Sequence, residues 1–202
     1  DGGVYYDDGP MSEFAGQPFV SMLSICALDS SDAFGNLVGI PWADADPWSD
    51  PFYQLALVRS DNDTFLRMHY TAGGSALNTE SSTGLLTYDG VYHAYCAVKN
   101  DTQDAQFYKD GLFHSTGNNA TNGSNIDTGN SDLVVSFSRN SSGTAEGTDG
   151  KLYINLMWNR ALSAAEVKSI SEDPYQVLKP TTQTGYFTAS AAGVTSAITG
   201  TA

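Results

Sequence analysis

The chain has 202 residues, 41% of them apolar and 16% charged, and its formal net charge is −14 at pH 7. A surface this acidic repels phosphate backbones, so we expect no nucleic-acid partner. No run of roughly 18 apolar residues is present, and no basic segment precedes an apolar one. We therefore expect neither membrane insertion nor a signal peptide.

Short strands dominate the chain. Runs of β-branched and aromatic residues bounded by turn residues predict strands at residues 4–6, 19–28, 37–40, 52–59, 65–70, 92–98, 105–108, 112–115, 133–138 and 152–158. The polar stretches 72–82, 118–130 and 140–150 predict loops. Strands of this length between polar loops favour one all-β domain, and a chain of this size buries roughly 70% of its unfolded surface.

The strand at residues 92–98 and the turn after it set the expected arrangement. Alternate residues of this strand form two faces, Ala94, Cys96 and Val98 on one and His93, Tyr95 and Ala97 on the other. Neither face is wholly polar, so we expect both to be covered. Further along, Asp110-Gly111 predicts a type I′ turn between two strands, because both residue types accept positive φ.

One short helix is expected near the C-terminus, at Ser163–Ser171. Ser163 and Glu166 have the spacing of a capping box, and Leu162 and Val167 have that of a hydrophobic staple. The helix is expected to end before Asp173-Pro174, because proline disfavours a helical residue ahead of it.

Composition divides the chain into three parts. We expect residues 18–180 to form the domain, residues 1–17 to be its start or a linker from a longer chain, and residues 181–202 to be an extended arm. This arm has too few large apolar side chains to build a core. Ordering its backbone costs roughly 1–2 kcal/mol per residue, so we expect identical subunits or other proteins to hold it. The expected anchoring side chains are Tyr186, Phe187, Val194 and Ile198.

Three stretches together resemble a known family. Tyr92–Val98 followed by Gln106–Gly111 resembles the "WHHVAVTYD…LYVDG" signature of laminin-G-like, concanavalin A-type domains. Gly150–Glu166 resembles that family's closing "G-x-I-D-E-V-R-I-Y-N-R-A-L-S-x-x-E", and Phe19–Leu28 resembles its early "FTISAWV" strand. The resemblance implies an all-β, two-sheet antiparallel jelly-roll sandwich, with the short helix near its end. The sequence departs from the family at two positions, with Tyr92 in place of Trp and Tyr153 in place of Asp.

The closing part of this region also resembles domains of tailed-bacteriophage virion proteins. The resemblance lies in Met157–Ser163 and in Asp173–Pro180. It implies a non-catalytic protein on the virion surface, in a capsid decoration or a tail fibre, with a lectin-like domain that contacts host-surface glycans. The arm would then contact other virion proteins or identical subunits. The alternative is a carbohydrate-binding or adhesion module of a larger extracellular or cell-surface protein.

A third hypothesis, a glycan-cleaving enzyme, lacks support in the sequence. Relatives with this fold include β-glucanases, whose E-x-D-x-x-E motif supplies the two carboxylates, about 5 Å apart, that retaining hydrolysis needs. None of the glutamates forms this motif: Glu13, Glu80, Glu146, Glu166 and Glu172. The histidines His69, His93 and His114 are scattered, and no nucleophile motif accompanies them. We therefore expect no catalysis.

Two cysteines, Cys26 and Cys96, fall in predicted strands. They either form a disulfide, if their strands are neighbours, or remain buried thiols, which is our expectation because cysteine is among the most buried residue types. Two cysteines are too few for a zinc cluster.

The loop at residues 41–51 carries the candidate ligands. Calcium binds carboxylate oxygens from irregular loops, which makes Asp44, Asp46 and Asp50 the candidate metal ligands. The alternative is that they only form turns. The candidate sugar-stacking side chains are Trp42 and Trp48, and the alternative is that both cover the edge of the sandwich.

We predict that chelation of calcium lowers the melting temperature of the protein. An ion bound only to the folded state stabilises it by about 2.7 kcal/mol at a free concentration about 100 times its dissociation constant. The double variant Asp44→Asn, Asp46→Asn should lose this response. A melting temperature that is the same with and without chelator would leave turn formation as the role of these residues.

Overall fold

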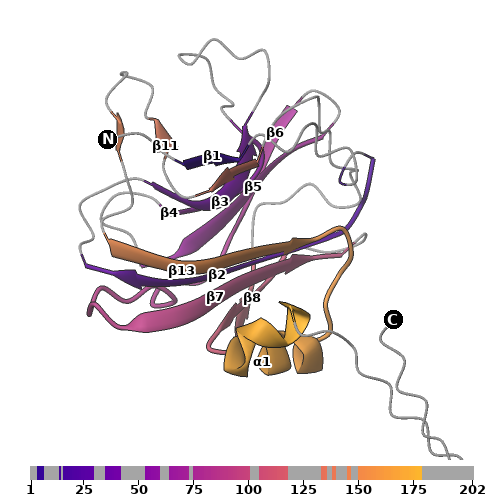
Figure 1. Cartoon of the computed structure of the whole chain (residues 1–202). Coiled ribbons are helices and arrows are strands. Elements are labelled where there is room, and N and C mark those ends of the chain that lie inside the picture. The colour runs from indigo at the N-terminus through magenta and orange to yellow at the C-terminus, as the bar shows by residue number, and fades with distance from the viewer. Residues whose placement is uncertain are drawn as a thin grey trace, which may run out of the picture.

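A computed structural model describes residues 4–6, 14, 16–29, 35–41, 53–59, 64–72, 75–100, 105–117, 133–135, 138–139, 145–146 and 150–178. Two antiparallel sheets pack face to face, and helix α1 (Ala164–Glu172) lies against the outer face of the second sheet (Figure 1). Within the described residues, no helix is long and apolar enough to cross a membrane.

The first sheet has six strands in the order β1-β10-β3-β4-β5-β6. Their bounds are β1 Val4–Tyr6, β3 Gly35–Pro41, β4 Tyr53–Arg59, β5 Leu66–Ala72, β6 Ser75–Glu80 and β10 Leu133–Val135. Strands β1 and β10 are far apart in the sequence but pair antiparallel, with Val4 opposite Val135. The first described strand, β1, is therefore part of the six-stranded sheet.

The second sheet has five strands in the order β13-β2-β7-β8-β9, all antiparallel. Their bounds are β2 Val20–Leu28, β7 Tyr92–Lys99, β8 Gln106–Lys109, β9 Leu112–Thr116 and β13 Gly150–Trp158. A separate ribbon consists of β11 (Ser138–Arg139) and β12 (Ala145–Glu146). The all-β architecture agrees with the prediction from the sequence.

Three of the predicted boundaries are wrong. The predicted loop at residues 72–82 contains β6, an edge strand whose polar sequence lacks the apolar alternation that predicts a strand. Glu80 of β6 forms an ion pair at 2.6 Å with Arg67 of the neighbouring strand β5. The single strand predicted at residues 133–138 is divided between β10 and β11, which belong to different sheets. The loop predicted at residues 140–150 contains β12 and the start of β13.

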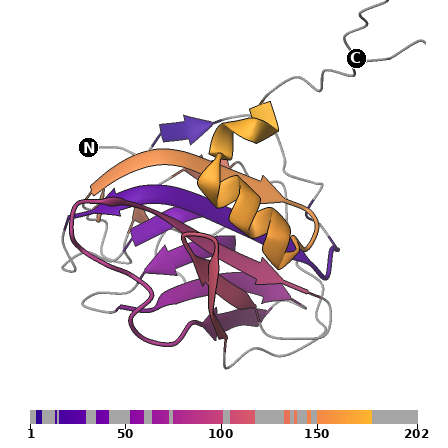
Figure 2. The same ribbon diagram turned by 90° about the horizontal axis from the view of Figure 1, so that it is seen from below.

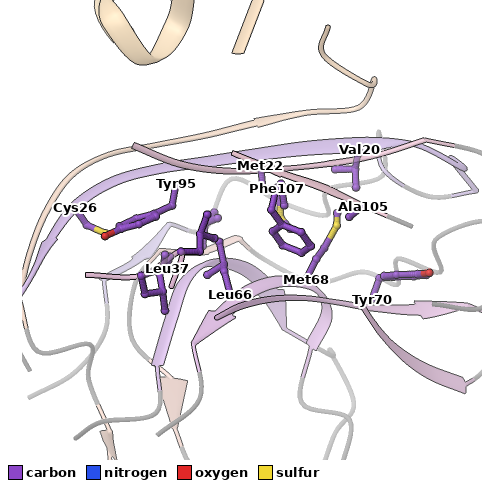
Figure 3. Close-up of a cluster of buried hydrophobic side chains, with 14 of the residues drawn as sticks. Val20, Met22, Cys26, Leu37, Leu66, Met68, Tyr70, Tyr95, Ala105 and Phe107 are labelled. Atoms are coloured by element: carbon purple, nitrogen blue, oxygen red, sulfur yellow. The ribbon is translucent and has the colours of Figure 1, made fainter. Parts of the chain in front are cut away.

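Strands β2 and β7 are covered on both faces. Between the sheets lies one core cluster, which includes Met22, Met68, Tyr70, Tyr95 and Phe107 (Figure 3). On the outer face lies a second cluster, in which Leu23, Ile25, Ala94, Cys96 and Val98 meet Leu162, Val167 and Ile170. The predicted alternation of β7 is thereby confirmed.

The two cysteines lie on opposite faces of the second sheet. Cys26 pairs in register with His93 and belongs to the core between the sheets, whereas Cys96 pairs with Leu23 and faces α1. Both are buried and neither forms a disulfide, as expected. Burial raises the pKa of the Cys96 thiol, because the thiolate is poorly solvated there.

Helix α1 begins with the predicted capping box. The Glu166 backbone N–H donates to Ser163 Oγ at 3.3 Å, and the Ser163 N–H donates to Glu166 Oε2 at 2.8 Å. The helix ends at Glu172, one residue later than predicted, and the 3₁₀-helix η2 (Pro174–Leu178) follows. Asp110 and Gly111 have φ angles of 51° and 75°, which confirms the predicted turn. Gly111 also lies under α1, where a Cβ would come within 2.8 Å of the Lys168 Cα.

We predict that Glu166→Gln lowers the melting temperature at pH 7 and has no effect near pH 2. The pKa of Glu166 falls from 4.5 to about 2, first because Arg160 donates a hydrogen bond to its carboxylate and then because the Ser163 backbone does. A depressed folded-state pKa contributes stability above the unfolded-state pKa, and this stability is lost as the pH falls from 4.5 to about 2.

Thermal unfolding followed by circular dichroism between pH 2 and 7 measures this difference, with the range taken from the same two pKa values. Glu172→Gln, the same change in the last turn of α1, is the matched control and should have little effect. An effect of Glu166→Gln that does not change with pH would contradict the electrostatic explanation.

Candidate functional site

Three half-exposed tyrosines from three different elements form a row on the outer face of the second sheet. Tyr92 begins β7, Tyr153 lies in β13 and Tyr175 lies in η2. The ring centroids of Tyr92 and Tyr153 are 5.6 Å apart, and those of Tyr153 and Tyr175 are 5.8 Å apart. The side chains are 48%, 49% and 47% exposed, so this tyrosine row presents ring surface to solvent.

A β-bulge places Tyr153 in the row. The register between β13 and β2 shifts between Leu152 and Ile154, so that Tyr153 is the additional residue. Ile154 packs on the outer cluster, and a bulge turns two successive side chains toward similar directions. Tyr153 therefore contacts Tyr92 on the outer face. Without the bulge, strict alternation would direct Tyr153 and Ile154 to opposite faces.

Exposed apolar side chains are concentrated in the segments of the chain that carry the row. Nine large apolar side chains are strongly exposed among the described residues, and seven of them belong to the row or lie within three residues of it in the sequence. The four beyond the tyrosines are Val91, Leu152, Val177 and Leu178. A concentration of this kind marks an interaction surface more often than isolated exposed side chains do.

The hydroxyl groups of Tyr153 and Tyr175 form a polar rim. A hydrogen bond with Tyr175 is the main reason that the pKa of Tyr153 is raised, and partial desolvation and the charges of Tyr175 and Tyr92 add to it. The two rings meet edge to face, at an interplanar angle of 77°. This edge-to-face contact sets the relative orientation of the two rings.

A histidine and two aspartates hold the start of β7. His93 Nδ1 lies 2.7 Å from Asp110 Oδ2, and its Nε2 lies 3.3 Å from Asp89 Oδ2. Asp110 also accepts the Ala94 N–H at 2.9 Å, and Asp89 accepts the Val91 N–H at 2.9 Å. The pKa of Asp89 is lowered, chiefly because of the Val91 hydrogen bond and then because of His93. These contacts fix the backbone on both sides of Tyr92.

Three glutamates have side chains in ion pairs. Glu80 pairs with Arg67, Glu166 with Arg160 and Glu172 with Lys168, at 2.6, 2.7 and 3.9 Å. No group of three histidine, cysteine, aspartate or glutamate side chains is arranged to hold a metal ion in the part of the chain that the structure describes. These three glutamates thus have structural roles.

Comparison with solved structures identifies the fold. The chain superposes on the CBM40 of the Ruminococcus gnavus IT-sialidase, bound to α2,3 sialyllactose, with a TM-score of 0.59 and 11% identity over 85% of this chain and 97% of that one. It superposes on a heptameric SAP-like pentraxin from Limulus polyphemus with a TM-score of 0.54 and 15% identity, over 77% and 70% of the two chains. The fold is a concanavalin A-like jelly roll.

A sialidase from Trypanosoma rangeli, in complex with a difluoro-KDN ligand, is similar with a TM-score of 0.53 and 16% identity. The similarity covers 84% of this jelly roll but only 26% of the sialidase chain. No family model matches the chain. No curated protein matches it either.

The residues proposed from the sequence as ligands and anchors are not among those that the structure describes. Strand β3 ends at Pro41, and the candidates Trp42, Asp44, Asp46, Trp48 and Asp50 fall outside the described residues. The anchoring candidates Tyr186, Phe187, Val194 and Ile198 also fall outside them. The calcium site, the tryptophan site and the arm therefore stay predictions.

We predict that Tyr175→Phe lowers the pKa of Tyr153 toward its ordinary value, because this change removes the hydroxyl whose hydrogen bond is the main cause of the raised pKa. Tyrosinate absorbance followed through an alkaline titration measures the shift, and the difference from a Tyr153→Phe chain isolates the signal of Tyr153. Tyr108→Phe, at a tyrosine outside the row, should leave it in place. A Tyr153 titration that Tyr175→Phe leaves unchanged would show that the hydroxyls do not interact in solution.

Proposed function

We propose that this chain is a non-catalytic, lectin-like module that binds glycans through the tyrosine row. The observation that carries this proposal is the row itself, three half-exposed rings from β7, β13 and η2 whose neighbouring centroids are 5.6 and 5.8 Å apart. An aromatic ring packs on the apolar C–H face of a sugar, while neighbouring hydroxyls bind the polar edge of the sugar. Tyr153 and Tyr175 supply both kinds of group.

The orientation of the rings favours a flexible oligosaccharide. The ring planes of Tyr92 and Tyr153 are inclined at 58° to each other, and those of Tyr153 and Tyr175 at 77°, so the three rings do not form one flat surface. A flat array matches a flat polysaccharide surface, whereas inclined rings match successive sugars that rotate along a chain. The fold supports the same function, since the Ruminococcus gnavus domain with this architecture was captured with α2,3 sialyllactose.

The charge of the chain favours neutral glycans. Its net charge is −14, and the carboxylates of Asp89 and Asp110 lie beside the backbone that carries Tyr92. A sugar with a carboxylate or sulfate would meet like charge there, which is unfavourable at close range. We therefore expect uncharged hexoses or N-acetylhexosamines to bind more tightly than sialylated glycans.

The virion surface is the proposed location. The stretches that resemble phage virion domains form the end of β13, α1's N-terminus and η2, next to the tyrosine row. In this proposal the arm at residues 181–202 binds identical subunits or other virion proteins. The Asp44, Asp46 and Asp50 loop would bind calcium, and Trp42 and Trp48 would extend the sugar contact. Mass spectrometry of purified virions tests the location, and its alternative is a module of an extracellular or cell-surface protein.

We predict that Tyr153→Ala weakens binding to a neutral oligosaccharide by roughly two- to tenfold, because an aromatic contact contributes about 0.5–1.5 kcal/mol. Tyr153→Phe keeps the ring and should retain most of the affinity. Titration calorimetry with ligands selected from a glycan array measures both, and product analysis should show intact glycans. Phe113→Ala, at a similarly exposed ring outside the row, is the control. Equal affinity of Tyr153→Ala and the unchanged chain would reject the row as the sugar site.

A further inference from the structure

The two edges of the second sheet differ in a way that suggests how copies of this chain associate. Strand β13 forms one edge and β9 forms the other. Tyr175 of η2 packs on Tyr153 of β13, and η2 ends at Leu178, the last described residue. The helix α1 lies across the outer face of the sheet between the two edges (Figure 2).

Strand β9 has few of the features that keep sheet edges from pairing. It pairs with β8 on one side and has no partner on the other among the described strands. Its sequence, Leu-Phe-His-Ser-Thr, contains no Lys, Arg, Asp, Glu or Pro, the residues that usually protect an edge. A register irregularity is the one protective feature that it has. Leu112 and Phe113 are 66% and 56% exposed.

Phe113 is a fixed part of this edge. Its ring meets Tyr108 edge to face, with centroids 5.8 Å apart, and Tyr108 belongs to the outer core cluster. The exposed ring is therefore supported from below by a buried residue. A large apolar side chain that is both held and exposed favours contact with another apolar surface.

The C-terminal segment of the chain matches this edge. Residues 180–202 contain no charged side chain, whereas the rest of the chain carries the whole net charge of −14. Two such acidic domains repel each other, but an uncharged segment can approach without this penalty. Val194–Ile198 is as long as β9, and alternation places Val194, Ser196 and Ile198 on one side of an extended strand.

We propose that the β9 edge of one copy binds Val194–Ile198 of a second copy as an additional strand. The added strand makes main-chain hydrogen bonds with β9, and its face that carries Val194 and Ile198 packs on Phe113. This inference specifies the subunit contact within the proposed function, and it does not depend on sugar binding.

The positions of the two edges determine the symmetry of this contact. The described chain ends in η2, which contacts β13, whereas the proposed contact is with β9 at the opposite edge of the next sheet, so the contact joins two different surfaces. Contacts of this kind close into rings or continue as filaments. The 16 residues from Lys179 to Val194 reach up to about 53 Å when extended, which also permits docking on the same chain. The experiment must therefore distinguish the two routes.

Disulfide trapping between full-length chains makes this distinction. One chain carries Phe113→Cys and the other carries Ile198→Cys, while the native Cys26 and Cys96 are buried and do not interfere. After mixing and mild oxidation we expect a linked dimer of the two chains. Val91→Cys replaces Phe113→Cys in the control, because Val91 is equally exposed at 55%, and it should give no more than background linkage.

Each result decides the proposal. A linked dimer with Phe113→Cys but not with Val91→Cys supports it. The absence of a linked dimer, or equal linkage in the Phe113→Cys and Val91→Cys mixtures, would overturn it. A single chain that carries both Phe113→Cys and Ile198→Cys tests docking on the same chain, and linkage found only within that chain would also overturn the proposal. Independently, Phe113→Lys should abolish self-association in sedimentation velocity, whereas Val91→Lys should not. Glycan binding by Phe113→Lys should be unchanged, so failure of this contact and failure of the sugar site are distinguishable.

Discussion

The structure depends on the burial of β2 and β7 on both faces. All nine residues of β2 are buried, and one face of each strand meets the first sheet while the other meets α1. Two polar residues of β2 are therefore buried with the rest, and the Ser21 hydroxyl is satisfied by donating to the Arg160 carbonyl at 2.8 Å and accepting the Leu162 N–H at 2.9 Å. These two bonds connect β2 to the segment that begins α1.

The position of α1 in turn determines the tyrosine row. Its capping box fixes where the helix begins, and Asp173 caps its other end with a backbone bond to Ser169 at 3.0 Å. The following 3₁₀ turn then brings Tyr175 to Tyr153, while the bulge in β13 brings Tyr153 to Tyr92. The tyrosine row thus depends on the buried core. Its three rings come into contact because packing in the core holds the helix, the strand and the bulge in place.

Features that depend on a few neighbouring residues can be predicted from the sequence, whereas contacts between residues far apart in the chain cannot. Alternation in β7, the capping box at Ser163 and the Asp110-Gly111 turn are each encoded within a few residues, and the structure confirms all three. Strand β6 is missed because it is an edge strand with a polar sequence. The tyrosine row is missed because its members are far apart in the chain and the bulge leaves no mark in the sequence. The available signal for the row was the departure from the family pattern at two positions, where Tyr92 replaces Trp and Tyr153 replaces Asp.

The two thiols, one on each face of the same sheet, distinguish two kinds of motion. Undocking of α1 alone would expose Cys96 to a thiol reagent, whereas Cys26 becomes reachable only when the sheets themselves separate. Regional openings of a protein often differ in free energy by several kcal/mol. The rates at which the two cysteines are modified would therefore report separately on the detachment of one helix and on the opening of the whole sandwich, without any substitution in the chain.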